Sequence, residues 1–131
     1  MSTDDRLERN KRNAVAFLTR AFVDGQPGEA ADTYMGPTYT QHHPGVPDGR
    51  DAFVQFATAV VGQFPGMSFE FKRVIAEGDY VALHGHIKTG PGDRGSAIAE
   101  IFRMNEDGKI VEHWDVAQEI PEGEPVNSGM L

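Results

Sequence analysis

The sequence predicts an α+β domain in which three N-terminal helices pack on a curved, mainly antiparallel sheet. The first observation is that apolar residues recur with a helical period up to Phe64 and alternate with a period of two from Met67 onward. The second is size: 131 residues, 39% hydrophobic and 24% charged, suit one domain with one core. Helices followed by a run of strands are typical of a sheet covered on one face. We therefore predict a single cone-shaped domain over residues 1–131, with an open end for a small ligand.

Three helices are expected in the first half, at Asp4–Asp24, Pro27–Met35 and Arg50–Phe64. Apolar side chains recur every three or four residues in these segments, and a glycine or proline follows each one. Phe56 lies on the apolar face of the third helix. The segment Tyr39–Gly49 is expected to start as a short extended piece and to become a Pro/Gly loop.

Four strands are expected in the second half, at Met67–Ala76, Tyr80–Lys88, Ser96–Met104 and Lys109–Ile120. Tight hairpin signals join the first strand to the second and the third to the fourth. The tail, Pro121–Leu131, is polar and rich in proline and glycine.

Composition excludes several functions. The chain carries 20 acidic and 12 basic residues, a formal charge of −8 that repels nucleic acid. It contains no cysteine, which excludes disulfides, thiolate nucleophiles and cysteine-ligated metals. No apolar run is long enough to span a membrane, and Met1–Arg12 lacks the features of a signal peptide. We expect a cytoplasmic protein that binds neither nucleic acid nor membrane.

The last predicted strand carries the strongest candidate site. His113 and Asp115 lie two residues apart and so share a face, and Glu100 on the preceding strand could join them across the sheet. A carboxylate in an apolar pocket has a raised pKa and can act as general acid or base. The alternative is a hydrogen-bonded core histidine beside a solvated aspartate. A β-bulge in this strand would turn Trp114 inward in place of Asp115.

Other residues could complete a pocket. His84 and His86 share a face and could join the polar cluster. Because neighbours on an extended chain point in opposite directions, only one of His42 and His43 faces inward, and we favour His42. The remaining candidates for the pocket lining are Tyr39, Phe56, Phe102 and Trp114. The spacing of His84 and His86 is a weak metal signal, and we expect neither metal nor cofactor.

Several motifs resemble those of the SnoaL-like polyketide cyclase family, within the nuclear-transport-factor-2-like superfamily. The resemblance is greatest to its bacterial branch of predicted aldol-condensation enzymes. It rests on Tyr39–Pro44 with Asp48-Gly49, Ile101-Phe102-Arg103, Asp107–Val116 and Asn127–Met130, and so runs over nearly the whole chain. The most specific part is the run Gly-Lys-Ile-Val-Glu-His-Trp-Asp, residues 108–115.

The resemblance implies the α+β cone and cofactor-free acid–base chemistry on a small molecule with acidic C–H bonds. Asp115 matches the carboxylate that acts as acid–base in the characterised cyclases. A histidine on the preceding strand assists in those enzymes, and this chain offers Glu100 there instead. His43 stands where many members of the branch have asparagine. Steroid isomerases, epoxide hydrolases, dehydratases and binding domains share the fold, so the fold does not select a reaction.

Our first functional expectation is a small lyase or isomerase of aldol-condensation or cyclisation type. Asp115 would abstract a proton next to a carbonyl, His113 or His42 would orient it or donate to the enolate oxygen, and Glu100 and His86 would complete the polar lining. The second is a non-catalytic ligand-binding or dimerisation domain. A hydrolase with an Asp–Arg–Asp site ranks lower, because Arg103 falls on the opposite strand face from Glu100.

The expected ligand is a small hydrophobic or carbonyl-containing molecule, and the expected assembly is a homodimer. The outer face of the sheet would form the dimer contact. The residues offered for this patch are Trp114, Val116, Ile101 and Met104, or Val81 and Leu83.

Overall fold

The computed structural model describes all 131 residues and confirms the α+β class. The helices are α1 (Thr3–Leu18), α2 (Pro27–Tyr34) and α3 (Arg50–Gln63), with a π-helical turn η1 (Thr19–Val23) after α1. The strands are β1 (Met35–Gln41), β2 (Ser68–Glu77), β3 (Tyr80–Lys88), β4 (Ser96–Met104) and β5 (Ile110–Glu119). All three helices and all four long strands agree with the sequence prediction within two residues, apart from the end of the first helix.

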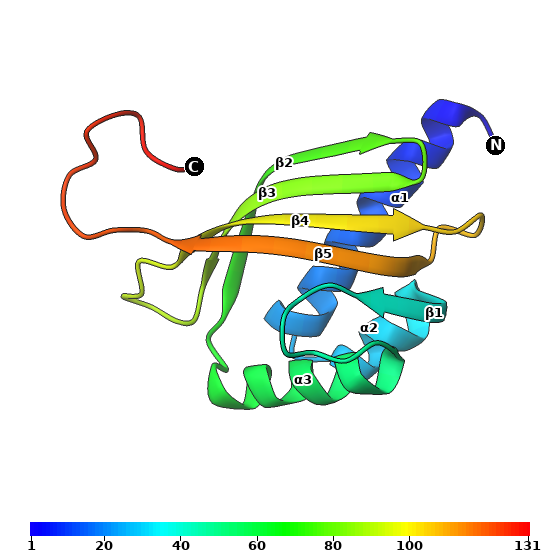
Figure 1. Cartoon of the computed structure of the whole chain (residues 1–131), viewed down its shortest axis with the longest axis horizontal. Coiled ribbons are helices and arrows are strands. Elements are labelled where there is room, and N and C mark those ends of the chain that lie inside the picture. Colours follow the sequence, from blue (N-terminus) through cyan, green and yellow to red (C-terminus); the bar gives the residue numbers. More distant parts are fainter.

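One five-stranded sheet, in the order β1-β5-β4-β3-β2, is covered by helices on one face (Figure 1). All neighbours are antiparallel except β1, which runs parallel to β5. The sequence predicted only a short extended piece near Tyr39, whereas β1 begins at Met35 and α2 ends at Tyr34. Gly36 allows this early start, because a Cβ there would lie 2.7 Å from the Val111 side chain on the neighbouring strand.

The first helix ends differently from the prediction. Its last turn is π-helical, with the Asp24 amide donating to the Thr19 carbonyl at 2.8 Å. A wider turn at a helix end is often found beside a functional site. Here it contains Phe22 and follows Leu18, two residues whose side chains line the cavity described below.

The core lies between the helices and the inner face of the sheet. Phe17 of α1 is its centre, with its ring 5.0 Å from that of Phe53 on α3 and 5.9 Å from that of Phe102 on β4. Burying one such ring contributes about 1.5–3 kcal/mol. Phe102 is fully buried in this cluster, so its expected place in the pocket lining is wrong.

An irregularity in the pairing of β2 with β3 shapes one wall of the cavity. The register between β2 and β3 shifts between Phe71 and Arg73. A Cβ on Gly85 would lie 2.5 Å from the Phe69 ring, so only glycine leaves room for that ring to lie across β3. Phe69 in turn lines the cavity. The glycine between His84 and His86 therefore has a packing role.

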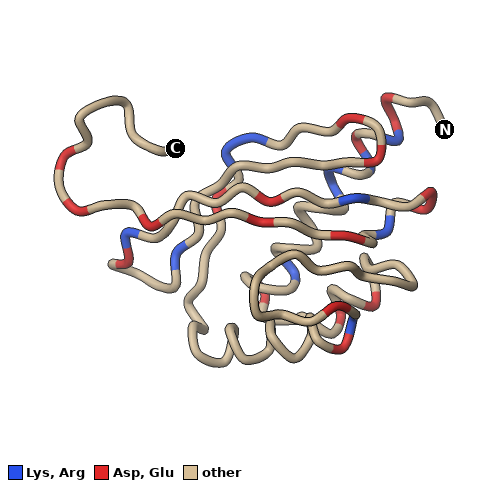
Figure 2. Tube along the Cα trace, in the orientation of Figure 1, with Lys and Arg blue, Asp and Glu red and all other residues tan.

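Charged residues are concentrated on α1, the strands and the loops, whereas α3 beyond its first turn carries none (Figure 2). The C-terminal tail after β5 runs away from the helices (Figure 1). No helix combines the length and the apolar character that a membrane span requires.

Candidate functional site

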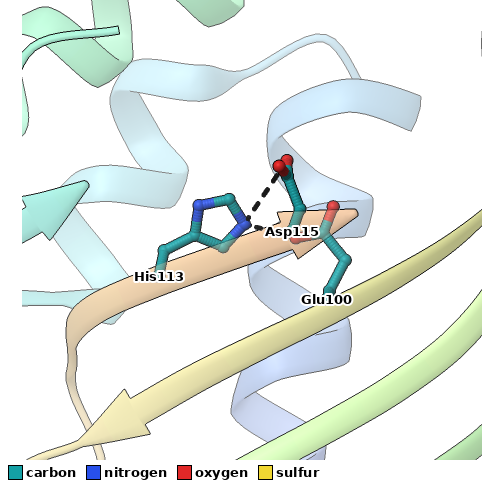
Figure 3. Close-up of side chains that lie close together, drawn as sticks. All are labelled: Glu100, His113 and Asp115. Carbon is teal, nitrogen blue, oxygen red and sulfur yellow. Dashed lines mark hydrogen bonds and ion pairs between the residues drawn. The ribbon is translucent and has the colours of Figure 1, made fainter. Parts of the chain in front are cut away.

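The inner faces of β4 and β5 bring three predicted residues together. Glu100 pairs with Asp115 in the strand register, and Phe102 pairs with His113. The register shift between the two strands lies between Arg103 and Met104, ahead of His113 along β5. It therefore leaves Asp115 facing inward, and the predicted grouping of Glu100, His113 and Asp115 is confirmed as a placement (Figure 3).

Gln41, at the end of β1, fixes the orientation of His113. Its side-chain oxygen Oε1 accepts from the backbone N–H groups of His42 and His43, at 3.1 and 3.0 Å. The same oxygen lies 2.7 Å from His113 Nδ1. A carboxamide oxygen can only accept, so Nδ1 of His113 carries a proton. The Gln41 backbone is held in turn by Asp48, whose Oδ1 accepts its N–H at 2.7 Å.

Glu100 and His113 form a buried pair. Nε2 of His113 is hydrogen-bonded to the Glu100 carboxyl group. The side chain of His113 is only 9% exposed and that of Glu100 only 6%. Burial raises the pKa of Glu100, and the hydrogen bond to His113 only partly opposes this effect. Since Nδ1 of His113 already donates to Gln41, the Nε2–Glu100 contact holds one proton that both groups can share.

Asp115 lies between two imidazoles. Both of its carboxylate oxygens are 2.8 Å from His43 Nδ1, and Oδ2 is 3.9 Å from His113 Nε2. The Asp115 side chain is 13% exposed and that of His43 is 37% exposed, so this end of the cluster reaches solvent. The histidine that faces the site is thus His43, and our preference for His42 was wrong.

His42 points to the outer face of the sheet. Its ring stacks on Trp114, with centroids 4.7 Å apart and planes 1° apart, and its Nε2 lies 2.8 Å from Glu112. Arg103 donates to the same carboxylate at 2.8 Å, and the hydrogen bonds from His42 and Arg103 lower the pKa of Glu112. The roles expected for His42 in catalysis and for Trp114 in the pocket are therefore contradicted, while the outward placement of Arg103 is confirmed.

His84 and His86 also lie on the outer face, so their expected place in the pocket is wrong. Arg73 donates to Nδ1 of His84 at 2.8 Å, and Nε2 of His84 donates to the Met130 carbonyl oxygen at 3.1 Å. Nε2 of His86 donates to the Arg94 carbonyl oxygen at 2.7 Å. The alternate residues of β3, among them Val81 and Leu83, face the core instead. Because Val81 and Leu83 are buried, they cannot form the outer dimer patch that the sequence suggested.

The polar cluster borders two adjoining hollows of about 40 and 140 Å³. Both are lined by Glu100, Asp115, His43, Leu18, Phe22 and Phe56. The smaller one adds Tyr39, Gln41 and His113, and burial raises the pKa of Tyr39. The larger one adds the apolar side chains Val60, Met67, Phe69, Ile87 and Ile98. Tyr39 and Phe56 thus line the cavity as expected.

A larger hollow of about 580 Å³ lies under the C-terminal tail and is lined only by residues between Gln118 and Leu131. The tail touches the outer face of the sheet through Met130 and contributes nothing to the inner cavity. The functional candidates are therefore confined to the inner cavity.

Glu100, His113 and Asp115 offer one ligand atom each within 4.8 Å of one another, a spacing that a metal ion could bridge. Hydrogen bonds to Gln41 and His43, together with the bond between His113 and Glu100, already give each of the three a partner. The arrangement is that of a proton-sharing network.

The sequence interpretation missed two members of this network, Gln41 and His43. Gln41 begins the Gln-His element, whose signal is an amide side chain just before a turn. His43 precedes Pro44, which fixes the chain direction at the entry to the loop.

Comparison with known families decides the relationship. The model of the SnoaL-like domain matches residues 14–113. The chain belongs to the SnoaL-like domain family. A comparison with curated proteins finds no match.

Solved structures agree in fold with this SnoaL-like chain. A provisionally assigned polyketide cyclase from Acidithiobacillus ferrooxidans is 20% identical, covers 89% of this chain and 91% of its own, and has a TM-score of 0.71. A provisionally assigned SnoaL-like polyketide cyclase from Jannaschia sp. CCS1 is 16% identical over 89% and 90%, with a TM-score of 0.71. A provisionally assigned SnoaL-like isomerase from Agrobacterium tumefaciens is 14% identical over 85% and 98%, with a TM-score of 0.68.

Proposed function

We propose that this SnoaL-like protein is a cofactor-independent acid–base enzyme, a lyase or isomerase of aldol-condensation or cyclisation type. Its substrate is a small carbonyl-containing molecule. The observation that carries the proposal is the position of Asp115, which lies between two imidazoles on the wall of an apolar hollow and is partly open to solvent. A base in such a place meets a substrate carbon and can also exchange its proton with water.

The geometry suggests a reaction in balanced steps. The Asp115 carboxylate takes a proton from the carbon next to a carbonyl, and the C–H electrons form an enolate. The proton shared by Glu100 and His113 supplies a hydrogen bond to the enolate oxygen. In an aldol closure the enolate carbon then bonds to a second carbonyl carbon, and the oxygen of that carbonyl takes the proton back from Asp115, which regenerates the carboxylate. In an isomerisation the proton returns to a different carbon.

His43 and Gln41 position the two acid–base groups. His43 donates to Asp115 through Nδ1, which holds the carboxylate in a fixed orientation. Gln41 holds His113 in the tautomer that leaves Nε2 for Glu100. Every group that the mechanism needs is supplied by the chain itself.

Proton abstraction can be measured without knowing the substrate. In D2O, the protein is expected to accelerate the exchange of the α-protons of cyclohexanone, followed by proton NMR. Asp115→Asn removes the base and is expected to reduce the protein-dependent rate by about 10²–10⁴-fold. Asp107→Asn, an exposed acid in the β4–β5 hairpin, is the matched control and should keep the wild-type rate. An acceleration of exchange that is equally large in wild type and Asp115→Asn would refute the proposal.

A second candidate is a non-catalytic ligand-binding or dimerisation domain of the same fold. The observation in its favour is that the polar groups of the site are partnered by one another. Binding of cyclohexanone with no acceleration of exchange would support it. A hydrolase with an Asp–Arg–Asp site is disfavoured, because Arg103 pairs with Glu112 on the outer face and no arginine lines the cavity.

A further inference from the structure

We infer that the substrate is an uncharged carbonyl compound of about one six-membered ring with a small substituent, and not a fused multi-ring molecule. This inference rests on the proposed function and specifies the substrate class of the same site. It is carried by the size of the cavity, the placement of its polar groups and the pairing of its charges.

The size of the cavity sets the upper limit. The apolar hollow measures about 140 Å³ and the adjoining polar one about 40 Å³. A cavity of about 150 Å³ holds a benzene molecule, and about 10–15 Å³ suffices for a water-sized group. Pockets for drug-sized ligands measure about 300–1,000 Å³. The apolar hollow therefore fits one ring, and the polar hollow fits a small polar substituent.

The walls fix how such a ring would lie. Phe22, Phe56 and Phe69 supply aromatic side chains, and Val60 of α3 and Ile98 of β4 also line the larger hollow. The titratable groups gather at the boundary with the smaller hollow. A ligand thus places its ring among apolar side chains and its carbonyl group beside Asp115 and Glu100. The Phe69 ring packs closely against Gly85, so displacing it to enlarge the cavity would cost packing energy.

The charges of the site select a neutral ligand. Each of the two carboxylates already has an imidazole partner, His43 for Asp115 and His113 for Glu100. No lysine or arginine lines either hollow. An anion would be desolvated without a counter-ion, and a cation would have to take a carboxylate from its histidine. An uncharged ligand requires neither the desolvation of an unpaired charge nor the loss of a carboxylate–histidine pair.

The test is a ligand titration followed by the amide signals of the full-length ¹⁵N-labelled protein. Three probes are compared: cyclohexanone, cyclohexanecarboxylate and the three-ring ketone anthrone. We expect cyclohexanone to shift signals around the cavity with a Kd of about 1 mM, the range expected for a ligand of this size. Cyclohexanecarboxylate and anthrone should bind at least about tenfold more weakly. Equal or tighter binding of either one in the cavity would overturn the inference.

A cavity-filling variant locates the binding. Val60→Phe places a ring in the larger hollow and is expected to weaken cyclohexanone binding at least about tenfold. Val126→Phe is the matched control, because Val126 is fully exposed on the tail. Ile98→Phe fills the same hollow from the sheet and replaces Val60→Phe if that variant does not fold. Unchanged binding in a folded filled variant would contradict the inference.

Failure of the substrate class and failure of the proposed function give different results. If cyclohexanone binds as expected and its α-protons do not exchange faster, the ligand class stands and the acid–base function is wrong. If the protein accelerates exchange of the anthrone methylene protons but neither binds cyclohexanone nor exchanges its α-protons, the function stands and the size limit is wrong.

Discussion

Gln41 determines which nitrogen of His113 carries a proton. Its Oε1 accepts three N–H groups, two from the backbone and one from His113 Nδ1. The proton between His113 and Glu100 is available only because the other nitrogen is occupied in this way. A residue with no acid–base role of its own thus determines where the protons of the site lie.

Replacing Gln41 should therefore lower the stability of the folded protein. Gln41→Leu leaves three N–H groups without their acceptor and is expected to lower the free energy of unfolding by about 2–4 kcal/mol, measured by urea denaturation. Gln41→Glu keeps an acceptor oxygen and should cost less. Equal losses in the two variants would mean that the hydrogen bonds at Oε1 do not hold the site together.

Glu100 should make stability depend on pH. Its pKa is about 4.3 in the unfolded chain and is raised in the folded state by burial. The neutral form is thus favoured on folding, and this contribution is full below about pH 4 and is lost as the pH rises through the folded pKa. From about pH 4.5 to 8, the wild type should lose stability relative to Glu100→Gln. The exposed Glu119→Gln is the control, and a difference that stays constant with pH would exclude this role of burial.

At the residue scale, alternation along the strands was enough to predict that Glu100, His113 and Asp115 meet. The same alternation places His84 and His86 on the outer face, because Val81, Leu83 and Ile87 share the other parity of β3, and the expectation that the two histidines enter the pocket went against this pattern. Alternation could not choose between His42 and His43. That choice depends on the Gln41 side chain, which accepts both backbone N–H groups and turns the chain at this point.

At the scale of the elements, the hairpins and helices followed from local patterns, whereas β1 and η1 did not. β1 pairs in parallel with β5, about 70 residues away in the register Gln41↔His113, and no local pattern reports such a partner. The π-helical hydrogen bonds of η1 span one residue more than those of an α-helix, a difference that apolar periodicity does not register.

Gly85 of β3 lies beside the register shift between β2 and β3 and packs against Phe69 of the cavity wall. Gly85→Ala would bring a Cβ to 2.5 Å from the Phe69 ring and 2.8 Å from the Glu70 carbonyl oxygen. The ring must move, and we expect a loss of about 1–3 kcal/mol in the free energy of unfolding together with weaker cyclohexanone binding. Gly62→Ala on α3 has open space at its Cβ and should not destabilise the protein. Identical effects of the two substitutions would contradict the packing role of Gly85.

At the scale of the whole molecule, helices cover one face of the sheet and leave the other face without a partner layer (Figure 1). That face exposes Ile75, Ile101 and Val116, the last at 75%. Trp114 is half-buried beneath His42, and Met104 is buried in the core, so the apolar patch is smaller than the sequence indicated.

We propose that two copies associate through this outer face. Light scattering should then give twice the mass of 14.3 kDa for the wild type, and Val116→Glu should shift it toward the monomer. Val126→Glu on the tail is the matched control and should leave the mass unchanged. A monomeric wild type would contradict the proposal without bearing on the inner cavity.

The central claim is that Asp115 and its histidine neighbours act on a small carbonyl compound inside the cavity. A crystal structure of the protein soaked with cyclohexanone tests it most directly. The expected result is a ring between Phe56 and Ile98, a carbonyl oxygen within hydrogen-bond distance of Glu100 or His113, and an α-carbon facing Asp115. A cavity filled by its own side chains, or a ligand bound only elsewhere, would contradict it.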